Sequence, residues 1–278
     1  MIQNQYYYLV AGLPELAFDA EHKKADLVSQ RDYIRENLES QDALLLDALF
    51  LGYDNENVLR FVNKKEGYSN LGTVPAAAYE DYAENIALFP SYIQEFVKAI
   101  TSEDSQPSTE ESEVSLEVNL LNRFYSYASK LDNEFIVRWF CFDRQLRNIL
   151  AATNARKLGK EVAPYLVGHD EFHEALTKSL TPDFGLRSDI PFMDKLMQAI
   201  DTADIIERER KFDMLRWDFI DEQNTFSYFN VDKVLGFMIK AMIIDRWSKI
   251  DSKVGEELLK KYSGDLKATF DLNTAFEE

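Results

Sequence analysis

Residues that interrupt helices are scarce in this chain, which contains 10 Gly and 7 Pro among 278 residues. This is about half the average usage of the two residues. Along most of the chain, apolar residues recur three, four or seven positions apart, as in the series Leu27, Ile34 and Leu38, which is the spacing of one face of an α-helix. Strand and helix patterns do not alternate, so a parallel-sheet nucleotide-binding fold is not expected. The sequence therefore predicts an all-α fold, a bundle of many helices.

The expected helices fall into two groups separated by an acidic run. Residues 1–100 are predicted to form an N-terminal helical unit, which starts with a short extended segment, Tyr6 to Pro14, rich in aromatic residues. Residues 101–113 contain only Ser, Thr, Glu, Asp, Gln and Pro, a composition that cannot bury a core and therefore predicts a mobile linker. Residues 114–278 are predicted to form the C-terminal helical units.

Several helix boundaries are expected at glycines and at capping side chains. We expect one helix to end at Gly52 and the next to begin with Asp54 as its cap. Asp132 is expected to cap a long helix from Asn133 to Leu158. The last helix of the chain is expected to span Lys253 to Tyr262.

The charge of the chain is strongly negative, because 31 basic and 49 acidic side chains give a formal net charge of −18. Such a chain repels phosphates, and its basic clusters are no longer than Lys64-Lys65, so nucleic acid and anionic bilayers are not expected partners. The most apolar stretch, Val234 to Ile244, is too short to cross a bilayer. The opening residues lack the features of a signal peptide, and the single cysteine, Cys141, cannot form an internal disulfide. We therefore expect a soluble, cytoplasmic protein without direct membrane insertion.

One pattern occurs twice at a constant offset. In each copy an apolar stretch that carries one cation is followed by an Asp-Arg pair. The copies are Phe135–Arg138 with Asp143 and Arg144, and Phe237–Lys240 with Asp245 and Arg246. Asp54 and Asn57 belong to a weaker third copy that lacks the arginine. Neighbouring helical residues point in different directions, so each Asp is expected to bond elsewhere than to its own Arg. We interpret these residues as polar fixtures of a repeated helix packing rather than as catalytic groups.

The strongest candidates for chemistry are His169 and His173. Their spacing lets two imidazoles face one metal ion from a helix, so a metal-dependent hydrolase is one alternative. The zinc-protease motif has Glu directly after the first His, however, and Asp170 stands there instead. The sequence contains no nucleophile-elbow, P-loop or dinucleotide-binding motif, and Cys141 is expected to be inert inside an apolar helix. We therefore expect no catalytic residue, no bound metal and no cofactor.

Four segments carry a resemblance to a known family. They are Tyr6–Pro14, Asp54–Leu59, Phe135–Gly159 and Val234–Ile250. The chain resembles the ring-coupling subunit of the central stalk in V-type (archaeal and vacuolar) ATPases, and in particular a divergent bacterial family of uncharacterised proteins encoded among V-type ATPase genes. In that family an acid is followed three residues later by Asn, which Asp54 and Asn57 match. Asp143 and Asp245 depart from the pattern, because Leu146 and Ser248 follow them.

The resemblance implies a non-enzymatic role. The ring-coupling subunit is a funnel of helices in three pseudo-repeats, which sits on the membrane rotor ring and receives the base of the central stalk. Stalk subunits and the ring are therefore the implied partners, with a location peripheral to the inner membrane and a part in proton or sodium transport. An acidic helical scaffold for another protein partner is a further alternative.

Overall fold

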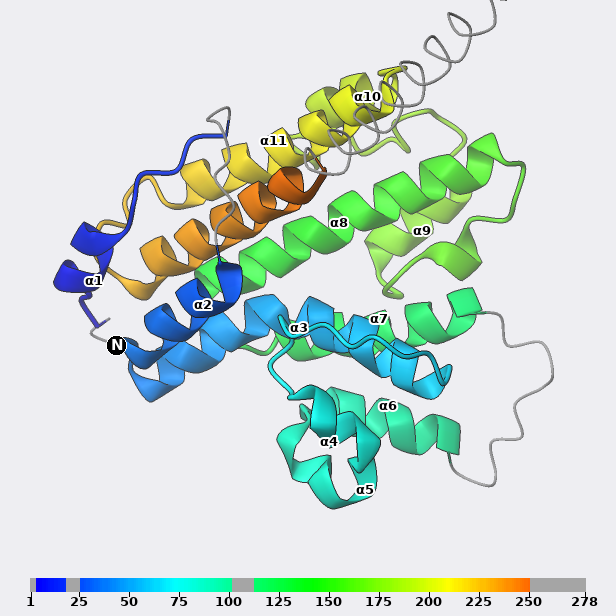
Figure 1. Cartoon of the computed structure of the whole chain (residues 1–278). Coiled ribbons are helices and arrows are strands. Elements are labelled where there is room, and N and C mark those ends of the chain that lie inside the picture. The colour runs from blue at the N-terminus through cyan, green and yellow to red at the C-terminus, as the bar shows by residue number, and fades with distance from the viewer. Residues whose placement is uncertain (1–3, 19–25, 102–112, 251–278) are drawn as a thin grey trace, which may run out of the picture.

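The computed structural model describes residues 4–18, 26–101 and 113–250 (Figure 1). Within these ranges every regular element is a helix and none is a strand, which confirms the predicted all-α fold. The elements are α1 (Tyr7–Gly12), α2 (Leu27–Glu36), α3 (Ser40–Val62), α4 (Ala76–Glu80), α5 (Tyr82–Asn85), η1 (Ile86–Leu88), α6 (Ser91–Thr101), α7 (Glu113–Ala128), α8 (Glu134–Lys157), η2 (Ala163–Tyr165), α9 (Glu171–Lys178), α10 (Met193–Ile200), α11 (Ile205–Gln223) and a helix over residues 231–250.

Helix α8 runs through the middle of the molecule. Figure 1 shows α11 and the 231–250 helix on one side of α8, and α3 and α7 on the other. Helix α6 packs on α7, and α10 packs on α11. A continuous core joins these layers, with fully buried side chains from α2, α3, α7, α8 and the 231–250 helix, namely Ile34, Phe50, Leu120, Ile149 and Met238. The helices before and after residues 102–112 therefore share one core.

The expected helix end at Gly52 is wrong, because α3 continues through it to Val62. Gly52 is exposed in the middle of the helix. A glycine there costs about 1 kcal/mol in helix propensity, which burial of Phe50 and Val58 on either side outweighs at roughly 2 kcal/mol for each such side chain. Asp54 consequently lies inside α3, fully buried, and does not cap a second helix.

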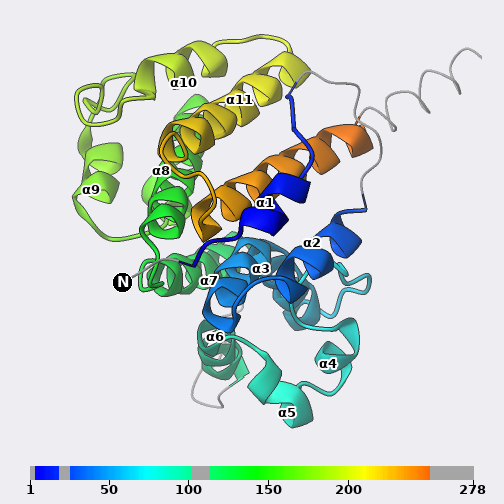
Figure 2. The ribbon, with the colours of Figure 1, turned by 90° about the vertical axis from the view of Figure 1, so that its left-hand side faces the viewer.

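The N-terminal segment also differs from the prediction of an extended strand, because residues Tyr7–Gly12 form α1. Tyr6 and Leu9 are both buried, and their spacing of three residues suits one face of a helix better than the alternating faces of a strand. The Tyr6 N–H donates to the Phe229 carbonyl at 2.6 Å. Figure 2 shows α1 lying over the 231–250 helix.

Most helix starts use a capping side chain, as the sequence suggested. The cap of α8 is Asn133 rather than Asp132, since the Asn133 Oδ1 accepts the Ile136 N–H at 2.8 Å. Asp170 and Asp204 cap α9 and α11 in the same way.

Two predicted segments fall wholly or largely outside the described residues. The linker 101–113 is described only at its ends, where Thr101 closes α6 and Glu113 opens α7, and the helix expected over Lys253 to Tyr262 is not described. Among the helices that are described, none is both long and apolar enough to cross a bilayer.

Candidate functional site

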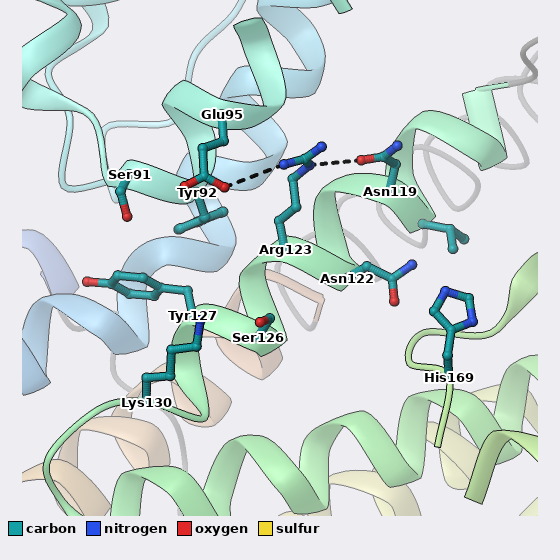
Figure 3. Close-up of a pocket in the computed structure, with 11 residues that line it drawn as sticks. Ser91, Tyr92, Glu95, Asn119, Asn122, Arg123, Ser126, Tyr127, Lys130 and His169 are labelled. Carbon is teal, nitrogen blue, oxygen red and sulfur yellow. Dashed lines mark hydrogen bonds and ion pairs between the residues drawn. The ribbon is translucent and has the colours of Figure 1, made fainter. Parts of the chain in front are cut away.

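His169 and His173 lie at the start of α9, with their ring centroids 5.5 Å apart. Burial, followed by the neighbouring His169, lowers the pKa of His173. Asp170 between them is already engaged, because it accepts from Arg144 at 2.6 Å and from the His173 N–H at 3.1 Å. In residues 4–18, 26–101 and 113–250, no three His, Cys, Asp or Glu side chains form a group that could hold a metal. Figure 3 shows His169 at the edge of a cleft between α6 and α7.

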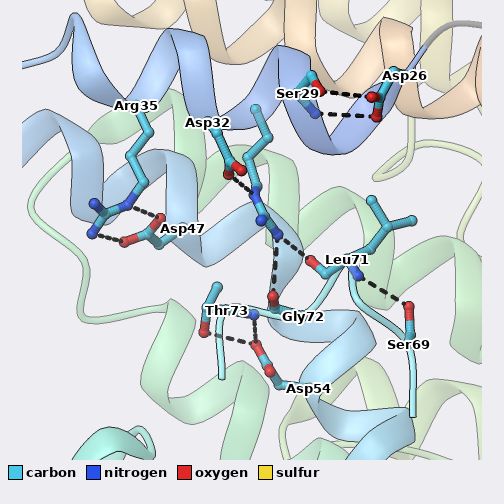
Figure 4. Close-up of polar contacts among 11 residues, drawn as sticks. Asp26, Ser29, Asp32, Arg35, Asp47, Asp54, Ser69, Leu71, Gly72 and Thr73 are labelled. Atoms are coloured by element: carbon cyan, nitrogen blue, oxygen red, sulfur yellow. Dashed lines mark hydrogen bonds and ion pairs between the residues drawn. The ribbon is translucent and has the colours of Figure 1, made fainter. Parts of the chain in front are cut away.

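Asp54 and Asn57 hold the loop that follows α3. The Asp54 carboxylate accepts the Thr73 N–H and hydroxyl at 2.8 Å each and the Val74 N–H at 3.1 Å (Figure 4). Burial raises the pKa of Asp54, although these hydrogen bonds act in the opposite direction. The Asn57 amide donates to the Ser69 carbonyl at 2.9 Å and accepts the Ser69 N–H at 2.7 Å. The acid and the amide are structural anchors of one helix–loop unit.

A second helix–loop unit uses the same device, which the sequence prediction missed. Asn148 is fully buried on α8. Its amide donates to the Val167 carbonyl at 2.7 Å and accepts the Val167 N–H at 3.0 Å. The signal was present as an Asn in an apolar helix, but the repeated pattern was aligned on Asp143 and its neighbour Arg144. Alignment on Asn57 and Asn148 matches the equivalent contacts.

The two Asp-Arg pairs separate in space, as expected. Arg144 binds Asp170, whereas Asp143 accepts the Tyr125 hydroxyl at 2.7 Å. Burial, and then the Asp143 charge, raise the pKa of Tyr125 well above its ordinary range.

In the second pair, Asp245 is buried and binds Lys249 one turn later in the same helix, at 2.6 Å. Arg246 turns instead to α11, where it binds Glu209 and, at 3.1 Å, Asp213. Neither Asp therefore pairs with its own Arg.

Asp143, Asp245 and Arg246 nevertheless meet at one place. They line a cleft of about 720 Å³ between α3, α8, α11 and the 231–250 helix, which we call the central cleft. Apolar side chains form much of its wall, namely Leu49, Trp139, Phe140, Ile239, Met242 and Ile243. Both copies of the repeated pattern thus contribute to a single hollow.

Asp213 is the most buried charge in the central cleft, at 1% exposure. It accepts from Arg216 at 2.8 Å and from the Trp247 indole N–H at 2.9 Å, in addition to Arg246. A carboxylate with three donors is stabilised as an anion and makes a poor general base. The sequence alone does not point to Asp213, because its partners come from distant parts of the chain.

A sequence model of one protein family matches residues 3–269, which is nearly the whole chain. The family is described as "Protein of unknown function (DUF2764)". The chain belongs to this family. No curated protein and no solved structure matches it.

In this DUF2764 protein, the central cleft is arranged for binding rather than for acid–base chemistry. Its described carboxylates at Asp143, Asp213 and Asp245 each accept from a phenol, guanidinium or ammonium group. Cys141 is exposed, which corrects the expectation that it is enclosed in the helix, but its thiol does not line the central cleft. The site thus combines an apolar wall with fixed, paired charges.

Proposed function

We propose that this protein is a non-enzymatic central-stalk subunit that couples the stalk to the membrane rotor ring of a V-type ATPase. Repetition supports the proposal, since α3 and α8 are each followed by a loop held by a buried Asn, as in a fold of pseudo-repeats. The 231–250 helix would supply the third unit of a funnel. The proposed location is the cytoplasmic face of the inner membrane, through the ATPase complex.

The observation that carries the proposal is Gly52 at the mouth of the central cleft. A Cβ built on Gly52 has no neighbouring atom within 4 Å, so the described part of the chain has no steric need for glycine. A mid-helix glycine is nevertheless unfavourable by about 1 kcal/mol. Close approach of another backbone is one of the uses that favour glycine, and we propose a helix of the stalk as that neighbour.

Charge supports the choice of partner. The chain carries a formal charge of −18, and in the central cleft burial, followed by the charges of Asp245 and Glu56, raises the pKa of Tyr53 to about 12. A basic stalk surface would be attracted to such a field and repelled by few groups. The ion moved by the complex would be a proton or sodium.

The test is ATP-driven ion transport in inverted membrane vesicles that carry Gly52→Leu in place of the native protein. Leu is a good helix former, so the variant should fold at least as stably, yet its side chain would obstruct the central cleft. We expect ion transport per ATP hydrolysed, and recovery of stalk and ring subunits with the tagged protein, to fall about tenfold or more.

Gly12→Leu is the matched control, because a Cβ at Gly12 also meets nothing within 4 Å and this residue does not line the cleft. Full transport with Gly52→Leu would remove the assignment of the central cleft. Full transport in vesicles that lack the protein altogether would overturn the coupling role.

A further inference from the structure

A second cleft concentrates positive charge on this acidic chain. It has a volume of about 690 Å³ and lies between α6, α7 and the loop that carries His169 (Figure 3); we call it the α6–α7 cleft. Arg123 and Lys130 line it from α7 and the turn that follows, and Glu95 is the acid among its described lining residues. With a formal charge of −18 over the chain, a hollow with more cations than acids stands out from its surroundings.

Hydrogen-bond donors converge on the same hollow. Arg123 donates from Nε to the Asn119 Oδ1 at 3.1 Å and pairs through Nη1 with Glu95 at 3.5 Å. Within the described ranges, Arg123 Nη2 and Lys130 Nζ have no protein partner. Ser126 adds an exposed hydroxyl one turn before Lys130. These groups are the kinds of donor that bind oxyanions.

The opposite wall of the α6–α7 cleft is held in place before any ligand arrives. Asn122 Oδ1 accepts the Gly168 N–H at 2.7 Å, which leaves its NH₂ end as the donor for a ligand. Gly168 has φ of +95°, and a Cβ there would collide with the Arg144 guanidinium. The loop before His169 is thus fixed by α7 and α8 together, and a preformed wall lowers the entropy cost of binding.

We propose that the α6–α7 cleft binds the phosphate group of a small ligand. Arg123 and Lys130 would supply the charge, and Asn122 and Ser126 the directed hydrogen bonds. A volume of about 690 Å³ leaves space beyond the phosphate for an organic group, beside the half-buried ring of Tyr127. Free phosphate, pyrophosphate and a nucleotide share this chemistry. A bilayer is a poor source, because an anionic lipid surface repels a chain of this net charge.

Isothermal titration of the full chain with inorganic phosphate, pyrophosphate and ATP, at constant ionic strength, tests the proposal. We expect saturable binding to one site. Lys130→Gln should weaken it about three- to fivefold, as for an exposed charge pair, and Arg123→Gln about tenfold or more. If ATP binds at least tenfold more tightly than phosphate, the ligand is nucleotide-like, whereas equal affinities identify the free anion.

Lys98→Gln is the control, because Lys98 is exposed on α6 but does not line the α6–α7 cleft. Ser126→Ala keeps the test independent of folding, should loss of Arg123 disturb the pair with Glu95. Absence of saturation with all three probes, or equal weakening by Lys98→Gln, would overturn the proposal. This result is separate from the coupling role, since binding is measured on the isolated chain and the variants leave the central cleft unchanged.

Discussion

Two aspartates show how the same side chain takes opposite roles according to its surroundings. Asp54 is fully buried on α3, and burial raises its pKa in spite of the donors at Thr73. Asp170 caps α9 near the surface, and there burial also raises the pKa, but hydrogen bonds from Arg144 and the His173 N–H prevail and lower it. The first carboxylate is held despite its charge and the second because of it.

The pH dependence of stability should therefore have opposite signs at the two residues. The unfolding free energy of the native chain minus that of Asp54→Asn should be largest below the ordinary pKa of 3.8 and should fall as the pH rises through the raised folded-state pKa. For Asp170→Asn the same difference should be present above pH 3.8 and lost as the pH falls through the lowered pKa. Denaturant unfolding between about pH 3 and pH 7 measures both, and parallel slopes would contradict the assignment.

The sequence identified residues that matter but not their partners. Asp54, Asn57, Asp143 and Asp245 were selected as polar groups in apolar helices, and each has a defined hydrogen-bond or ion-pair partner. Asn148 was missed because its partner is a backbone group 19 residues away in a loop that carries no recognisable motif. Periodicity reports which face of a helix is buried, whereas it carries no information on which loop returns to that face.

At the scale of elements, the sequence predicted the existence of helices better than their ends. The scarcity of Gly and Pro and the spacing of apolar residues were enough for the all-α fold. Gly52 and the α1 segment were misassigned for a shared reason, namely that burial against distant elements outweighs local propensity. The central cleft could not be predicted, because four elements from three parts of the chain form it.

Two helical glycines should respond in opposite ways to substitution by alanine. A Cβ on Gly236 would collide with the buried Asn224 amide and come within 2.9 Å of Ile220 Cγ2, at the packing of the 231–250 helix on α11. Gly236→Ala should destabilise the protein by about 1–3 kcal/mol through overpacking. Gly52→Ala should stabilise it by about 0.5–1 kcal/mol, because the space is open and alanine favours the helix. Urea denaturation compares the two, and a stabilised Gly236→Ala would show that these helices are not in close contact.

At the scale of the whole molecule, the 231–250 helix links two surfaces. Its second half lines the central cleft from Ile239 to Ile250. Its start follows a loop whose aromatic side chains are exposed and lie against α1, where the rings of Tyr7 and Phe229 are 4.8 Å apart. We call this surface the aromatic end, and its exposed members are Tyr7, Tyr8, Phe226, Tyr228 and Phe229. A rigid helix that joins two binding surfaces is what a coupling subunit needs.

The aromatic end is expected to be a contact with the membrane-bound part of the complex. Clustered exposed aromatic groups mark interaction sites, and Tyr8 and Phe226 are 97% and 86% exposed. The double variant Tyr8→Ser, Phe226→Ser should keep its unfolding free energy within about 0.5 kcal/mol, because neither ring is packed. Recovery of ring subunits with the tagged protein from detergent-solubilised membranes should fall about tenfold. Leu180→Ser is the control, since Leu180 is also 97% exposed but follows α9, far from α1 (Figure 1). If the double variant recovers as much ring as Leu180→Ser does, the aromatic end is not that contact, and the ring must be held through another face.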